Sequence, residues 1–105
     1  MEIIERITRA EERLNRAKAA IRLANEALEA LEKARDDFAL VNSYYGSPDW
    51  FADLAAYDNN ELGADRSTVP AGILSEDSAY NMLTDYNELA IEMSRMAGEM
   101  LEKGY

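Results

Sequence analysis

The 105-residue sequence contains no cysteine and no histidine, and these two absences exclude much of the chemistry that proteins perform. Without cysteine there is no disulfide, thiolate nucleophile, iron–sulfur cluster or cysteine zinc site. Without histidine there is no serine–histidine or cysteine–histidine catalytic pair and no histidine ligand for a metal. An enzyme of this composition would depend on carboxylates, tyrosines and lysines alone. We therefore expect a protein without enzymatic activity, bound metal or cofactor.

Prolines, glycines and long apolar runs are also scarce. Two prolines and five glycines are too few for a linker-rich or fibrous chain, and 48% of the residues are apolar, which is typical of a globular protein. The first six residues mix acidic, apolar and basic side chains, unlike a signal peptide. No uncharged run approaches the ~20 residues that cross a bilayer. We expect one soluble, cytoplasmic domain over residues 1–105.

Basic residues are also scarce. The sequence has 11 basic and 21 acidic residues, which gives a net charge of -10. The imbalance lies in residues 38–105, which contain twelve acidic and three basic residues. This charge argues against nucleic acid or an anionic membrane as a partner. A basic protein remains compatible with it, because complementary charge favours association.

Small and apolar residues recur from Ile3 to Leu31 at alternating steps of four and three, which is the pattern of a heptad seam. One column contains Ile7, Leu14, Ile21 and Leu28, and the other contains Ile3, Ala10, Ala17, Ala24 and Leu31. No proline or glycine interrupts the chain before Gly46. The pattern predicts one long helix over residues 2–45, with a bend near residues 35–37, where Arg35 takes a seam position.

A second helix start follows Gly46. Ser47 offers a hydroxyl cap, Pro48 suits the first helical position, and Asp49 suits the positive end of the helix dipole. We expect a short helix over residues 48–57. The following residues, 58–72, are rich in asparagine, glycine and proline and predict an irregular loop.

The last helix is predicted over residues 76–103. Ser75 has the position of its cap, and Glu76 and Asp77 fall in its first turn. Alanine recurs in its seam at Ala79, Ala90 and Ala97, as it does in the first helix. Two alanine-bearing seams favour close approach of the two helices.

These elements predict an all-α fold, a long antiparallel helical hairpin with coiled-coil-like close packing and the short middle helix across one end. The long helix would span ~66 Å and the last helix ~42 Å at 1.5 Å per residue. About a third of the long seam would then lack a partner in its own chain. Because an uncovered heptad seam associates with itself, we expect a homodimer.

One set of candidate functional residues lies at the two ends of the connecting region, and antiparallel packing would bring them to one pole of the bundle. This candidate interaction surface contains Tyr44, Tyr45, Trp50, Asp53, Ser75, Glu76 and Asp77. A second interpretation is structural: the aromatic rings close the end of the bundle, and the polar groups satisfy backbone donors or hydroxyls.

Two local patterns point to catalysis or metal binding only in part. Residues 58–63 match half of a calcium loop, but Leu62 stands at the fifth position and Val69 at the twelfth, where ligands are needed. A solvated acidic turn is the better interpretation. Ser75 has no histidine to activate it as a nucleophile, and no motif places a lysine beside it.

Three short motifs together resemble a known family. They are Tyr44-Tyr45-Gly46-Ser47, the pair Trp50 and Asp53, and Gly72-Ile73-Leu74-Ser75-Glu76-Asp77. At this spacing, and with a charged N-terminal helix, they resemble the bacterial family called domain of unknown function 4298 over nearly the whole chain. The resemblance implies a small helical protein, and it implies no substrate, cofactor or catalytic residue.

The sequence favours a non-enzymatic protein-interaction module. The alternative is an acidic inhibitor or nucleic-acid mimic that binds a basic groove, since Asp85, Glu88, Glu92, Glu99 and Glu102 place negative charge along the last helix. A third class, a carboxylate-based enzyme, would need two acids in one buried pocket.

Overall fold

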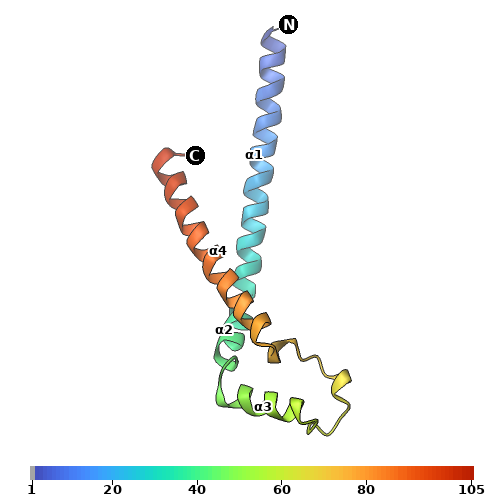
Figure 1. The fold of residues 1–105 in the computed structure, drawn as a ribbon. Helices are drawn as coiled ribbons and strands as arrows, with labels where there is room; N and C mark the ends of the chain where they lie inside the picture. Colours follow the sequence, from blue (N-terminus) through green and yellow to red (C-terminus); the bar gives the residue numbers. More distant parts are fainter. Residues whose placement is uncertain (1) are drawn as a thin grey trace. The chain divides into compact units, whose positions relative to one another are not determined.

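The computed structural model describes residues 2–105, and its regular elements are all helices (Figure 1). The four α-helices are α1 (Glu2–Lys33), α2 (Arg35–Tyr44), α3 (Pro48–Asp58) and α4 (Glu76–Lys103). Two short 3-10 helices, η1 (Arg66–Thr68) and η2 (Gly72–Leu74), lie between α3 and α4. Since residues 2–105 contain no strand, the protein is all-α, as the sequence predicts.

The chain forms two compact units, the first ending at Asp36 and the second comprising Asp37–Tyr105. The first unit consists of α1 and the start of α2. The second contains the rest of α2, together with α3, η1, η2 and α4. The predicted hairpin would pair α1 of the first unit with α4 of the second, and it stays a prediction.

The single helix predicted over residues 2–45 is divided in the structure, because Ala34 belongs to neither α1 nor α2. The charges around this position suit a helix end followed by a helix start. Lys33 lies in the last turn of α1, where a cation is favourable, and Asp36 and Asp37 are the second and third residues of α2. The boundary between α1 and α2 therefore lies next to residues 35–37, where the sequence predicts a bend.

The first unit buries none of the residues of α1. Its seam has large side chains that remain about half exposed or more, at 63% for Ile7, 47% for Leu14 and 63% for Ile21. Ion pairs such as that between Lys33 Nζ and Glu29 Oε1, at 3.3 Å, lie on its surface. Pairs of this kind contribute little stability, so α1 has little support within its own unit.

The turn between α2 and α3 uses the residues that the sequence marks as a helix start. Gly46 has a φ of +77°, a left-handed conformation that glycine adopts without steric cost. The Ser47 hydroxyl then accepts a hydrogen bond from the Trp50 backbone N–H at 3.1 Å, with Pro48 at the first helical position. The cap fixes where α3 begins and so positions Trp50.

Replacing Ser47 with alanine is expected to lower the free energy of unfolding of the second unit by about 1 kcal/mol, because the Trp50 N–H loses its acceptor. Ser43→Ala is the matched control, since the Ser43 hydroxyl only donates to the Leu40 carbonyl within α2. Urea unfolding followed by circular dichroism compares the two variants. Equal midpoints would show that the cap carries no stability.

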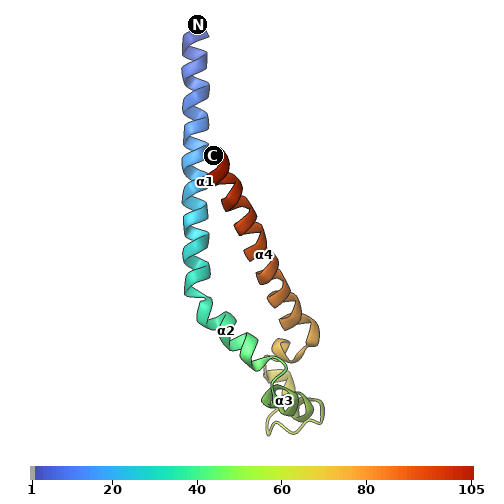
Figure 2. The ribbon, with the colours of Figure 1, turned by 90° about the vertical axis from the view of Figure 1, so that its left-hand side faces the viewer.

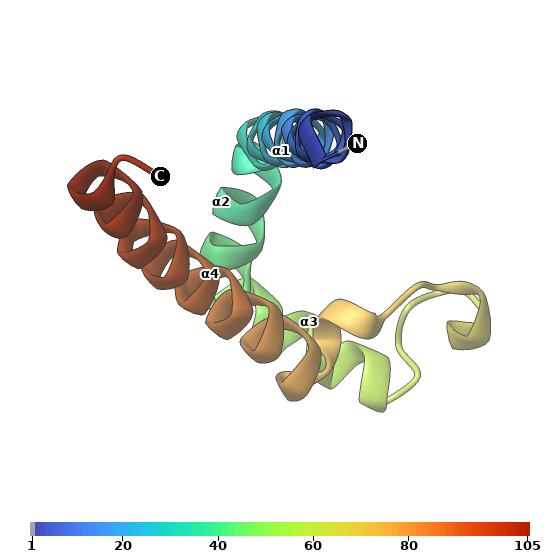
Figure 3. The same cartoon turned by 90° about the horizontal axis from the view of Figure 1, so that it is seen from above.

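The sequence predicts an irregular loop over residues 58–72. In the structure, the segment between α3 and α4, residues 59–75, contains the two 3-10 helices. Asp65 caps η1, and its carboxylate accepts hydrogen bonds from the Ser67 N–H at 3.0 Å and the Ser67 hydroxyl at 2.8 Å. η2 packs against both α3 and α4. Figures 2 and 3 show η2 and the first turns of α4 next to α3. The segment is thus ordered by short-range capping at one end and packing at the other.

The core of the second unit is small. Among the described residues only Trp50, 2% exposed, and Ala79, 3% exposed, are buried. α2 and α4 also meet through Phe38 and Tyr86, whose ring centroids lie 4.3 Å apart. Within residues 2–105, no helix is long and apolar enough to cross a membrane.

Candidate functional site

Trp50 is the centre of the predicted interaction surface, and the structure buries it. Its indole Nε1–H donates a hydrogen bond to the Ile73 carbonyl at 2.9 Å, which ties α3 to η2. Two rings meet it edge-on, with centroid distances of 5.2 Å for Tyr45 and 5.0 Å for Phe51. Because the indole is enclosed and its N–H is used, Trp50 holds elements together and presents no surface to a partner.

Tyr45, just beyond the end of α2, connects that helix to the start of α4. Its hydroxyl donates to the Glu76 backbone carbonyl at 3.2 Å, and its ring lies against Trp50. Glu76 takes part through its main chain here, rather than through its carboxylate. The sequence brings Tyr45 and Glu76 to one pole, and the structure shows this contact directly.

Tyr44 connects α2 to α3. Its hydroxyl donates to Asp53 Oδ2 at 2.7 Å, the short distance expected when the acceptor is a carboxylate. This hydrogen bond raises the pKa of Tyr44 to about 12, with smaller contributions from burial and from the negative charges of Asp53 and Asp49. The phenol is therefore held in its neutral form.

The Tyr44–Asp53 pair predicts a loss of stability at high pH. The folded pKa of about 12 lies above the ordinary value of 10.0, so the contribution is complete below pH 10 and disappears as the pH rises through about 12. Absorbance titration of the tyrosinate should show one of the six tyrosines ionising late. Tyr44→Phe should remove that late step, and Asp53→Asn should move it toward the ordinary range. A late step that survives Tyr44→Phe would contradict the assignment.

The three remaining predicted residues form the start of α4. The Ser75 hydroxyl accepts a hydrogen bond from the Ser78 N–H at 3.4 Å, so Ser75 acts as the helix cap that the sequence predicts. Glu76 and Asp77 are exposed in the first turn, where acids suit the helix dipole. The structure thus joins Tyr44 to Asp53, and Tyr45 to Trp50 and Glu76, while the carboxylates of Glu76 and Asp77 face solvent.

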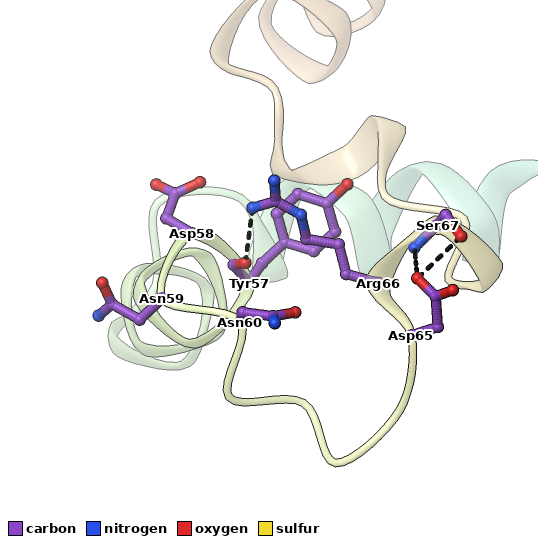
Figure 4. A pocket seen from close by; sticks show the side chains of 7 residues that line it. All are labelled: Tyr57, Asp58, Asn59, Asn60, Asp65, Arg66 and Ser67. Atoms are coloured by element: carbon purple, nitrogen blue, oxygen red, sulfur yellow. Dashed lines mark hydrogen bonds between the residues drawn. The ribbon is translucent and has the colours of Figure 1, made fainter.

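A polar pocket lies between the end of α3 and η1, and Figure 4 shows its lining. Arg66 closes one side: its guanidinium donates to the Tyr57 carbonyl at 3.2 Å and lies 5.2 Å from the centroid of the Tyr57 ring. On the other side, the Ser67 backbone N–H donates to the Asp65 carboxylate and lowers its pKa. No sequence motif includes Arg66, and the only sign of its role is that it is the one basic residue of this loop.

The polar side chains of the half-matching calcium loop are spread apart in the structure. The Asp58 and Asn59 side chains point away from Asp65, as Figure 4 shows, and Leu62 is half-buried. Among residues 2–105, no group of three or more acidic side chains is arranged to hold a metal ion. The cation already present in the pocket is Arg66.

A second groove, also missed from the sequence, lies between α2 and η2. It is lined by Leu40, Val41, Ser43, Tyr44, Ser47, Asp49 and Ile73. Leu40 is 66% exposed, and the only sequence signal of the groove is the adjacent apolar pair Leu40 and Val41, neither of which falls on a seam position when the heptad of the first helix is continued.

The acidic row along α4 is interrupted by a base. Arg95 pairs with Glu92, and its other guanidinium nitrogen lies 2.8 Å from Glu99 Oε1. The hydrogen bond and the charge of Arg95 lower the pKa of Glu92, and the two glutamates raise the pKa of Arg95. The middle of the acidic face is therefore partly neutralised within the helix.

Comparison with known proteins gives one family. No curated protein and no solved structure matches the chain. The sequence does match the family described as "Domain of unknown function (DUF4298)" over residues 7–96, which include the motifs around Tyr44, Trp50 and Ser75. Since the match covers most of the 105 residues, the chain belongs to this family.

Proposed function

We propose that this protein is a non-enzymatic interaction module that works as a homodimer, with α1 as the element that binds the second copy. The support is the exposure of the α1 seam. Ile7, Leu14, Ile21 and Leu28 share one column and are 47–63% exposed. An isolated helix with such a face gains stability only by packing, and a heptad seam packs on another helix.

The pole around Trp50 is a weaker candidate for the interaction surface. The hydroxyls of Tyr44 and Tyr45 and the indole N–H of Trp50 already donate to groups of the same unit. A partner at this pole would have to compete with those hydrogen bonds. The seam of α1 requires no such exchange, so the contacts favour α1. This dimer uses the face that the predicted hairpin would give to the last helix, so it takes the place of that hairpin.

Mimicry of a nucleic acid is the alternative that the acidic composition leaves open. A phosphate track requires closely spaced negative charge along one face. Arg95 lies between Glu92 and Glu99 and binds both, which interrupts such a track in α4. We therefore place the protein-interaction module first.

The proposal is tested by sedimentation of the full chain at tens of micromolar. The expected mass is twice that of the chain, 11.8 kDa. Leu14→Gln/Ile21→Gln, which makes the seam polar, should give the monomer. Leu23→Gln/Leu40→Gln is the matched control, since both leucines are 66% exposed and lie off the α1 seam, and it should stay dimeric.

A monomeric wild-type chain at that concentration would end the proposal. So would equal dissociation of the seam variant and the control, because a contact elsewhere would then be responsible. Circular dichroism of both variants ensures that a lost dimer reflects the seam and not a change in helix content.

A further inference from the structure

We infer that two copies of the chain pair through α1 in antiparallel orientation; this inference rests on the proposed function, because it assigns the geometry of the same dimer. Two properties of α1 lead to it: the unequal size of its two seam columns and the charges that flank the seam. Each concerns exposed residues of the first unit.

The two seam columns differ in side-chain volume. The column of Ile7, Leu14, Ile21 and Leu28 is large throughout, whereas the centre of the other consists of Ala10, Ala17 and Ala24. In a parallel pair each column faces itself, so three layers would contain only alanines and would leave gaps between the layers of leucine and isoleucine. In an antiparallel pair the large column faces the small one. Each alanine then lies opposite a leucine or an isoleucine.

Two registers set each of the three alanines opposite a large residue, and we select the one that does not place the two Lys18 side chains against each other. It places Leu14 of one copy opposite Ala17 of the other. The same register sets Ile7 opposite Ala24, Ile21 opposite Ala10 and Leu28 opposite Ile3. Alanines at these positions allow the two backbones to approach closely, and the large side chains fill the space above them.

Charges beside the seam agree with the same orientation. Glu11 and Lys18 occupy equivalent flanking positions, one heptad apart. In the antiparallel pair each Glu11 faces Lys18 of the other copy, whereas a parallel pair would place Arg13 against Lys18 and so offset its favourable contact of Arg6 with Glu11. Like charges at these positions oppose pairing, so the parallel arrangement is disfavoured.

The orientation is measured by pulsed electron spin resonance on the full chain. Because the sequence has no cysteine, a single substitution gives one attachment point for a spin label. Glu5→Cys and Asn15→Cys place labels on the outer face, near one end and near the middle of α1. In the proposed register the Asn15 labels of the two copies lie close together. The Glu5 labels are separated along the axis by 21 residues, or about 30 Å.

A short distance at position 15 together with a long distance at position 5 supports antiparallel pairing. Short distances at both positions would show a parallel pair and would overturn this inference, while the homodimer itself would stand. Long distances at both would place the contact away from α1 and overturn the inference and the proposed function together. The two failures are therefore distinguishable.

Charge reversal gives an independent measurement. Lys18→Glu should weaken the dimer by about tenfold, because residue 18 of each copy then faces Glu11 of the other with like charge. Adding Glu11→Lys should restore it. The control, Lys103→Glu on α4, changes the net charge equally and should leave the dissociation constant near that of wild type. A dimer strengthened by Lys18→Glu would show the parallel pair, in which residue 18 faces Arg13, and would overturn the inference.

Discussion

Trp50→Ala is expected to lower the free energy of unfolding of the unit 37–105 by about 3–5 kcal/mol, the cost of truncating a buried aromatic residue. Trp50 is 2% exposed, and only Ala79 is comparably buried among the described residues. The substitution also leaves the Ile73 carbonyl without its donor. Since small domains are marginally stable, a loss of this size should unfold most of the unit.

Urea unfolding of the purified variant, followed by circular dichroism, measures this loss. Tyr80→Ala is the matched control, because Tyr80 is also aromatic, lies in a helix of the same unit and is 60% exposed. We expect the control to stay close to wild type. Similar midpoints for the two variants would show that Trp50 is not the centre of the core.

Ala79→Leu is expected to destabilise the same unit by about 1–3 kcal/mol through overpacking, since the added carbon atoms have no space. Ala79 is 3% exposed and lies in the first turns of α4, which pack against η2. The helix itself tolerates leucine well, so the penalty measures packing and not helix propensity.

The control for Ala79→Leu is Ala97→Leu, an exposed alanine of the same helix. Thermal unfolding should show a lower midpoint for the first variant and little change for the second. A stabilising effect of Ala79→Leu would reveal unfilled space beside η2 and contradict the proposed close packing.

The elements that the sequence predicts well are those whose signals are local. Ser47 and Ser75 cap α3 and α4, where a hydroxyl precedes an acidic first turn. α4 spans Glu76–Lys103 in the structure, which is the range predicted from the sequence. Gly104 follows it in a left-handed conformation and ends the helix. Such signals act within one or two helical turns, so they can be read without knowledge of the rest of the fold.

The contacts of the candidate site could be predicted only in outline. Sequence motifs select Tyr44, Trp50 and Asp53, but they do not tell that Tyr44 donates to Asp53 or that Trp50 donates to Ile73, 23 residues away. Such pairs depend on how α2, α3 and η2 pack. The same holds for Arg66 and Tyr57, whose stacking depends on the course of the loop.

The division of the first predicted helix at Ala34 shows a further limit. Neither proline nor glycine lies nearby, so the usual signals of a break are missing. Arg35 in a seam position and the charges of Lys33, Asp36 and Asp37 favour a change there, yet each is also common inside long helices. These weak preferences therefore predict a bend in one helix at this place, but they do not predict that α1 ends and α2 begins there.

The burial of Trp50 has a consequence for following this protein in solution. It is the only tryptophan, so intrinsic fluorescence excited at the indole reports on the unit 37–105 and not on α1. Ellipticity, in contrast, contains large contributions from both α1, with 32 residues, and α4, with 28. Coincident curves from the two signals would mean one cooperative transition, and an emission shift that runs ahead of the ellipticity would mean that the units melt separately.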